Sequence, residues 1–179
     1  AGFYVNATTD KWSENFQMWD YITIELPKLI FENFPLLKNA QGITGHSMGG
    51  HGALTMAMTL PDQYQSVSAF APIGNPTKSE WGQKQFKEYL GEDTTTWEKH
   101  DSTILMQKVG FHSNVLIDQG NADNFLDLLQ PESLKNAMDT REQEGQFRIS
   151  NGYDHSYFFV MSFMREHIEH HATILNVID

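Results

Sequence analysis

Residues Gly45-His46-Ser47-Met48-Gly49 form a G-x-S-x-G motif between an apolar strand candidate, 41–44, and a helix predicted over 48–60. In this context the motif predicts a sharp strand-to-helix turn that exposes the serine hydroxyl. The glycines permit close backbone approach, and the amide N–H of Met48 would point at an anion beside the serine. Ser47 is therefore the candidate nucleophile and Met48 a candidate oxyanion donor. A glycine-rich turn without chemistry is the alternative that the motif alone leaves open.

A serine nucleophile needs a base, and the base needs an orienting group. Of the eight histidines, His155 lies in the loop 151–156, between a strand candidate, 147–150, and a helix predicted to begin near residue 156. Loops at strand ends are where open α/β sheets carry catalytic groups. We therefore predict that His155 is the base.

The other histidines fit structural roles better. We expect packing or hydrogen bonding for His46, pointing away from Ser47, and for His51. Surface positions are predicted for His100 and His112. The last helix carries a cluster without the H-E-x-x-H order, so we expect no metal there and a solvated or subunit-facing position for His167, His170 and His171.

Two aspartates compete for the orienting role. The apolar run 115–117 predicts a buried parallel strand, and residues 118–123 would form the loop after it. Asp118 ends the strand and would anchor the loop by accepting backbone N–H bonds. Asp123 lies further along the loop and can reach a histidine from the next strand. We favour Asp123, which gives the chain order Ser47, Asp123, His155 found in α/β-hydrolases.

The rest of the chain fits an α/β fold. A helix is predicted over 16–33 with a kink at Pro27, and a strand over 66–70, in βαβ alternation. Residues 74–99 predict an irregular excursion over the sheet edge, because Pro and Gly punctuate a segment rich in aromatic residues. One of these, Trp81, is a candidate for lining a substrate pocket.

Composition limits the partners. Twenty-three acidic and 12 basic residues give a net charge of −11, which argues against nucleic acid and anionic membrane surfaces as partners. The chain has no cysteine, which excludes disulfides and thiolate metal sites and fits a cytoplasmic protein. The longest apolar stretch, 157–164, is too short to span a bilayer.

The sequence resembles the S-formylglutathione hydrolase (esterase D) family along its whole length. The resemblance lies in GHSMGGHGAL, DQGNADNF and GYDHSYFF, together with AGFYVNAT and YITIELPKLI. It implies the α/β-hydrolase fold, with a mostly parallel sheet and helices on both faces. It implies Ser47 as nucleophile, Asp123 as acid and His155 as base. It further implies a cytoplasmic enzyme of formaldehyde detoxification that acts on a small thioester or ester, without cofactor or metal, as a possible homodimer.

The resemblance also implies that residues 1–179 are a single domain that lacks its N-terminal part. The family has further strands upstream, and the loop with the second oxyanion donor lies there, so we expect that donor outside this chain. Two alternatives remain: a carbohydrate or feruloyl esterase of the same fold, because fold does not fix substrate, and a non-catalytic fragment with an incomplete oxyanion hole.

Overall fold

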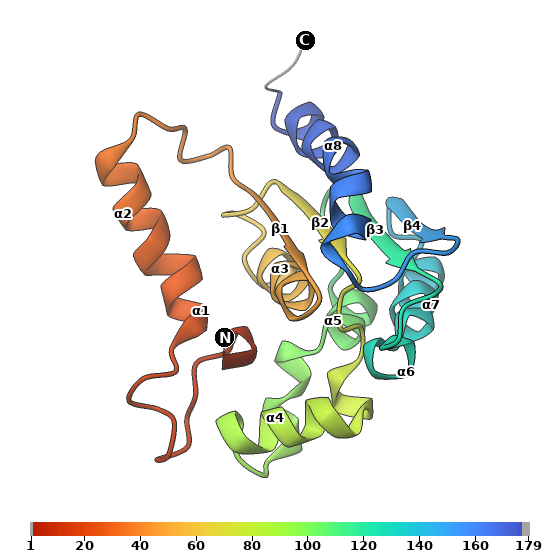
Figure 1. Cartoon of the computed structure of the whole chain (residues 1–179). Coiled ribbons are helices and arrows are strands. Elements are labelled where there is room, and N and C mark those ends of the chain that lie inside the picture. Colours follow the sequence, from red (N-terminus) through yellow and green to blue (C-terminus); the bar gives the residue numbers. More distant parts are fainter. Residues whose placement is uncertain (1, 177–179) are drawn as a thin grey trace.

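A computed structural model describes residues 2–176. Within this range the strands form one parallel sheet in the order β1-β2-β3-β4 (Figure 1). Their bounds are Gly42–His46 for β1, Ser66–Phe70 for β2, Val115–Gly120 for β3 and Gly145–Ser150 for β4. The predicted α/β arrangement with a parallel sheet is confirmed, and the carboxyl ends of all four strands meet at one edge.

Helices cover both faces of the sheet. Successive side chains of a strand point to opposite faces. On β2, Ser68 bonds to a histidine of α8 (Tyr157–Ile174) and Phe70 stacks on another. Val67 and Ala69 instead belong to the core formed with α3 (Met48–Thr59), α5 (Ser102–Lys108) and α7 (Pro131–Arg141). The face toward α8 is therefore partly polar, whereas the opposite face is apolar.

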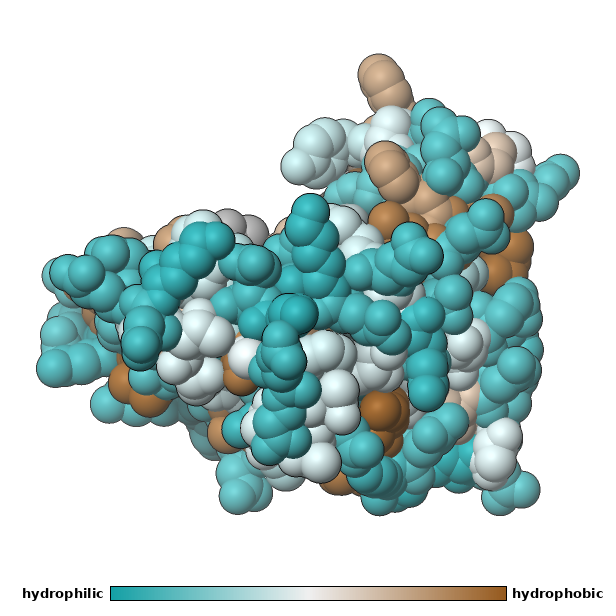
Figure 2. Space-filling model, turned by 90° about the horizontal axis from the view of Figure 1, so that it is seen from below, coloured by the Kyte–Doolittle hydropathy of each residue, from teal (hydrophilic) through white to brown (hydrophobic). Residues whose placement is uncertain are grey.

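A second apolar cluster lies near the carboxyl edge of the sheet. It joins η1 (Gly2–Tyr4), α4 (Glu80–Leu90), the short α6 (Leu126–Leu129) and the first turn of α8. Its fully buried members include Phe3, Phe70, Phe86 and Phe159. Figure 2 shows the molecule from below, on the side of α4, where hydrophilic residues cover most of the surface.

The predicted helix over 16–33 is interrupted. It consists of α1 (Met18–Asp20), a π-helical turn η2 (Tyr21–Glu25) and α2 (Leu26–Asn33). Pro27 follows the π turn at the start of α2, where its missing N–H and its ring are tolerated. None of the α2 side chains is buried among the described residues. Instead α2 and β1 line an apolar groove of about 590 Å³.

The irregular excursion predicted over 74–99 is wrong. This segment holds the helix α4 and three 3₁₀ turns: η3 (Pro76–Lys78), η4 (Thr94–Thr96) and η5 (Glu98–His100). The Ser79 hydroxyl caps α4 by accepting the N–H of Gly82 at 3.1 Å. Gly82 lies so close to the preceding turn that a Cβ there would be 2.3 Å from the carbonyl oxygen of Pro76. Pro76 and Gly82, which suggested irregular structure, instead fit α4 closely against η3.

No helix in the described range 2–176 has the length and apolar character needed to cross a membrane.

Candidate active site

The predicted strand-to-helix turn is confirmed at Ser47. Its backbone adopts φ 60° and ψ −119°, between the end of β1 and the start of α3. Its N–H donates to the carbonyl oxygen of Phe70 on β2 at 2.8 Å, which holds the strained turn in place. A Cβ on Gly45 would lie 2.2 Å from the carbonyl oxygen of Gly49, so only glycine fits there. Met48 is the first residue of α3, where an amide N–H has no acceptor within the helix.

Asp123 lies in the loop after β3 and accepts three hydrogen bonds. Its Oδ2 accepts from Nδ1 of His155 at 2.6 Å and from Nε2 of Gln119 at 3.1 Å. Its Oδ1 accepts the backbone N–H of Phe125 at 2.8 Å. The side chain is fully buried. This many donors hold a buried carboxylate in a single orientation.

His155 lies between the end of β1 and the loop of Asp123. Its ring is 4.5 Å from the ring of His46 and 5.1 Å from that of Phe125, which meets it edge-on. Because Nδ1 donates to Asp123, the other ring nitrogen is available as an acceptor. The side chain remains 18% exposed, so this nitrogen can meet a reacting group.

These contacts bring the predicted residues together at the carboxyl edge of the sheet. His46, whose ring packs on His155, is the residue immediately before Ser47. The strained serine and the histidine that carries the Asp123 hydrogen bond are therefore neighbours. A partly exposed serine, an imidazole with a free acceptor and a buried carboxylate are the groups that nucleophilic acyl transfer requires.

His46 has a closer relation to the site than the sequence suggests. The prediction that it packs is confirmed, but the partner is His155. Burial, and then the nearby His155, lower the pKa of His46, while Asp123 opposes this shift. Its Nε2 is shielded and has no hydrogen-bond partner among residues 2–176. A neutral ring thus packs against the candidate base.

The expected role of Asp118 is wrong. β3 continues to Gly120, so Asp118 lies within the strand and faces α8 rather than the loop. Its carboxylate accepts from Arg148 of β4 and from Nε2 of His167 at 3.0 Å, instead of from backbone N–H groups. Burial raises the pKa of Asp118, but the hydrogen bonds from His167 and Arg148 outweigh it, and the net pKa is lowered. Arg148 also pairs with Glu166 of α8.

The remaining histidines divide into confirmed and corrected predictions. His51 is buried, as expected, and bonds through Nδ1 to the carbonyl oxygen of Ile73 at 3.1 Å. His112 is exposed, as expected. His100 is not a surface residue: it is mostly buried and packs against Trp19.

The prediction that the histidines of α8 are solvated or face another subunit is also wrong, because α8 turns these side chains onto the sheet. His167 is 1% exposed beside Asp118. His171 bonds to the hydroxyls of Ser66 at 2.6 Å and Ser68 at 2.8 Å. His170 bonds to the carbonyl oxygen of Val67. The seam between α8 and the sheet is therefore polar.

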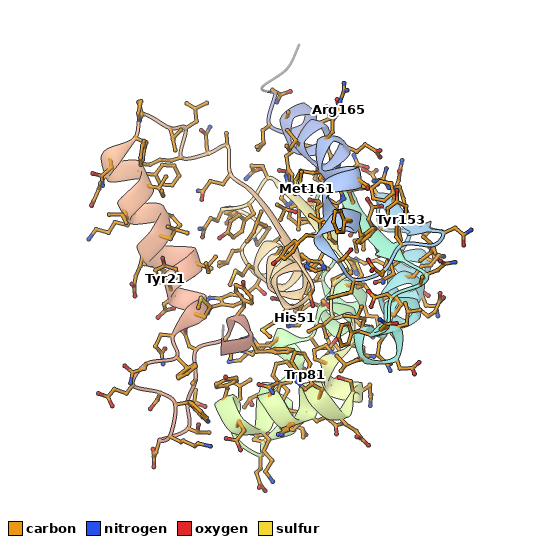
Figure 3. The ribbon with its side chains drawn as sticks, viewed as in Figure 1. Tyr21, His51, Trp81, Tyr153, Met161 and Arg165 are labelled. Carbon is orange, nitrogen blue, oxygen red and sulfur yellow. The ribbon has the colours of Figure 1, made fainter. Side chains whose placement is uncertain are left out.

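Trp81 belongs to the second apolar cluster. It lies on α4 below the sheet, partly buried, with its ring 5.4 Å from that of Phe3 (Figure 3). Phe3 also contacts His51, at 5.0 Å between ring centroids. Met48 packs against the same cluster. Trp81 is therefore connected to the turn at Ser47 through apolar packing.

Comparison with known proteins identifies the family. The model of the family Esterase, described as "Putative esterase", matches residues 1–170. The chain belongs to this esterase family. It is 63% identical to S-formylglutathione hydrolase of Paracoccus denitrificans over 96% of this chain and 62% of that protein, and 49% identical to the mouse S-formylglutathione hydrolase over 98% and 64%. The predicted resemblance is thus confirmed.

Solved structures confirm the fold. The S-formylglutathione hydrolase from Agrobacterium tumefaciens superimposes with a TM-score of 0.93 at 42% identity, over 98% of this chain and 64% of that chain. The chain therefore has the α/β-hydrolase fold. A ferulic acid esterase matches with a TM-score of 0.73 at 17% identity, over 96% of this chain and 64% of that chain, a likeness of fold alone. The chain spans 62–64% of the length of the curated relatives it matches.

Proposed function

We propose that the protein containing this segment is a serine thioesterase that hydrolyses S-formylglutathione to formate and glutathione, and that also cleaves short acyl esters. The observation that carries this is the 2.6 Å hydrogen bond from His155 to Asp123 beside the strained turn of Ser47. The identity to proteins named S-formylglutathione hydrolase supports the choice of substrate.

In the proposed mechanism Ser47 is the nucleophile. His155 takes the hydroxyl proton as Ser47 attacks the formyl carbonyl, and the tetrahedral intermediate collapses with loss of glutathione thiolate, which His155 protonates. Water activated by His155 then releases formate from the formyl-serine. Asp123 holds the imidazole in the required tautomer and stabilises the imidazolium that forms.

The oxyanion would be stabilised by the N–H of Met48 at the start of α3. A second donor would come from outside residues 1–179. Trp81 would help to line the acyl pocket through the cluster that it shares with Met48. This chemistry needs no cofactor or metal.

The wider role that we propose is formaldehyde detoxification in the cytoplasm by a protein that can form homodimers. The identity to the S-formylglutathione hydrolases supports this role. The net charge of −11 supports a small-molecule substrate rather than nucleic acid or an anionic membrane.

The nucleophile is tested by Ser47→Ala in the full-length enzyme that contains this segment. We expect loss of fluorophosphonate labelling and a fall in kcat on the order of 10⁴- to 10⁶-fold. Ser162→Ala is the matched control, because it removes an exposed hydroxyl that bonds to the carbonyl oxygen of Phe158 within α8. Labelling that persists in the Ser47→Ala enzyme would reject Ser47 as the nucleophile.

The substrate is tested by comparing kcat/KM for S-formylglutathione with that for a chromogenic acetate ester. We expect the thioester to be strongly preferred. A preference for feruloyl or sugar acetate esters over S-formylglutathione would support the related esterase activity instead.

A further inference from the structure

Gln119 is a buried amide that the proposed mechanism does not use. It is the penultimate residue of β3 and is 0% exposed. Because side chains alternate along a strand, it faces away from Asp118 and α8. Its Nε2 donates to Oδ2 of Asp123 at 3.1 Å and to the carbonyl oxygen of Gly120 at 3.0 Å. Both of its N–H groups therefore have acceptors.

The other end of the same amide is unsatisfied. Oε1 of Gln119 is buried and accepts no hydrogen bond from any residue in the described range. A buried polar atom without a partner is costly, and an apolar side chain of the same size would avoid that cost. The reversed amide would place Oε1 against a carboxylate and a carbonyl oxygen, which is repulsive. The two hydrogen bonds that the Gln119 amide donates therefore explain why an amide occupies this position, since an apolar side chain would fill the space equally well.

The acceptor that Gln119 holds is the oxygen that also binds His155. Oδ2 of Asp123 accepts from both side chains, while Oδ1 is fixed by the N–H of Phe125. Without Gln119, one side-chain donor and one backbone donor would remain, and Oδ2 would keep only its bond from His155. The carboxylate could then rotate, and its negative charge would be less dispersed.

We propose that Gln119 is a positioning residue. It fixes Oδ2 of Asp123 toward His155 and, by donating to that oxygen, limits the proton affinity of the Asp123–His155 pair. This inference rests on the proposed function. The other titratable groups that face the pair are His46 at the end of β1, with Tyr157 beside it, and Asp154 in the loop of His155. They are unchanged in the variants below.

Two substitutions in the full-length enzyme test the proposal. Gln119→Met keeps the volume and removes the donors, so we expect kcat to fall about 10- to 100-fold with KM little changed. The acidic limb of the kcat/KM profile should move about half a pH unit upward. Gln119→Glu keeps the shape and adds an acid beside Asp123, so the same limb should move upward by more than about one pH unit.

Gln143→Met is the matched control. Gln143 is a partly buried amide whose Nε2 donates to the carbonyl oxygens of Phe111 and Ser113 at the opposite end of the sheet. This variant should lower the midpoint of urea unfolding and leave the pH profile in place. If Gln119→Met behaves in the same way, with an unmoved acidic limb, Gln119 is only structural and the proposal is wrong. Failure of both Gln119 variants to fold would also overturn it.

A spectroscopic measurement separates this proposal from the proposed function. The proton on Nδ1 of His155 should give a low-field NMR resonance that is lost in Asp123→Asn and shifted in Gln119→Met. A resonance that persists in Asp123→Asn would contradict the assignment of the pair itself. A resonance lost in Asp123→Asn but identical in wild type and Gln119→Met would overturn the role of Gln119 alone.

Discussion

Residues 2–176 contain two Asp–His pairs with a buried carboxylate, and the pairs differ in what surrounds them. Asp118 and His167 lie on the α8 face of the sheet, 3.0 Å apart, with both side chains sealed. Asp123 and His155 lie at the carboxyl edge, 2.6 Å apart, and the histidine is 18% exposed. The sealed pair also includes Arg148, so its carboxylate is neutralised by a permanent cation. The open pair has only neutral donors besides the histidine.

The difference shows what makes such a pair useful for chemistry. In the sealed pair the second nitrogen of His167, Nδ1, is buried without a partner in the described range, so it cannot meet a substrate. In the open pair the ring of His155 remains 18% exposed and packs on His46, the residue immediately before Ser47. The distance between Asp and His is similar in both. Access and the neighbouring hydroxyl separate the candidate site from a structural ion pair.

The largest effect is expected at the open pair. Asp123→Asn should lower kcat by about 10⁴-fold, because the histidine loses its orientation and charge support. The urea midpoint should fall less than in Asp118→Asn, since the amide keeps an acceptor for Phe125 and no permanent cation loses its partner. Steady-state kinetics and urea unfolding of the same preparation measure both quantities.

A substitution in the sealed pair should lower the free energy of unfolding and leave catalysis nearly unchanged. Asp118→Asn leaves Arg148 and His167 without their carboxylate, and breaking such a buried pair costs about 3–5 kcal/mol. We expect the free energy of unfolding to fall by this amount while kcat of the folded enzyme stays within a few-fold. A stable but inactive Asp118→Asn enzyme beside an active Asp123→Asn enzyme would make Asp118 the catalytic acid.

The two pairs also show what could be predicted from the sequence. The turn at Ser47, the strand 66–70 and the loops of Asp123 and His155 are marked by local patterns that the fold preserves. The local sequence pattern gave a wrong prediction where the hydrogen-bond partners of a residue come from distant elements. Asp118 and Gln119 are polar residues that would end an isolated strand, yet β3 continues because α8, β4 and the Asp123 loop bond to them.

The same reason explains the histidines of α8. Helical spacing showed that His167 and His171 share a face, but their polarity suggested solvent. The serines that bond to His171 lie a hundred residues earlier, on β2, where small polar side chains leave room for the ring, and His167 bonds to Asp118 of β3. The prediction for residues 74–99 was wrong for another reason. Gly82 suggested a break in regular structure, but a glycine is required there by the close contact with Pro76.

The smallest effect that we expect is on the pH dependence of stability, and it concerns His171, which lies on the same face of the sheet as the sealed pair. Burial, followed by the nearby His170 and His167, lowers the pKa of His171 on the sealed side to about 4. The unfolded chain, with an ordinary histidine pKa near 6.5, binds this proton more tightly than the folded chain does. The stabilising contribution is therefore complete above pH 6.5 and is lost as the pH falls toward 4.

Replacing this residue should flatten the acid dependence of stability. In His171→Gln the slope of the unfolding free energy between pH 6 and 5 should decrease by at most about 1.4 kcal/mol per pH unit, the limit set by the uptake of one proton. His112→Gln, at an exposed position, is the control and should keep the slope of the parent. Urea unfolding across this pH range measures the slope. We expect neither variant to move the acidic limb of the kcat/KM profile. An unchanged slope in His171→Gln would mean that the folded protein does not hold His171 neutral. A shifted acidic limb of kcat/KM would mean that His171 is coupled to the active site.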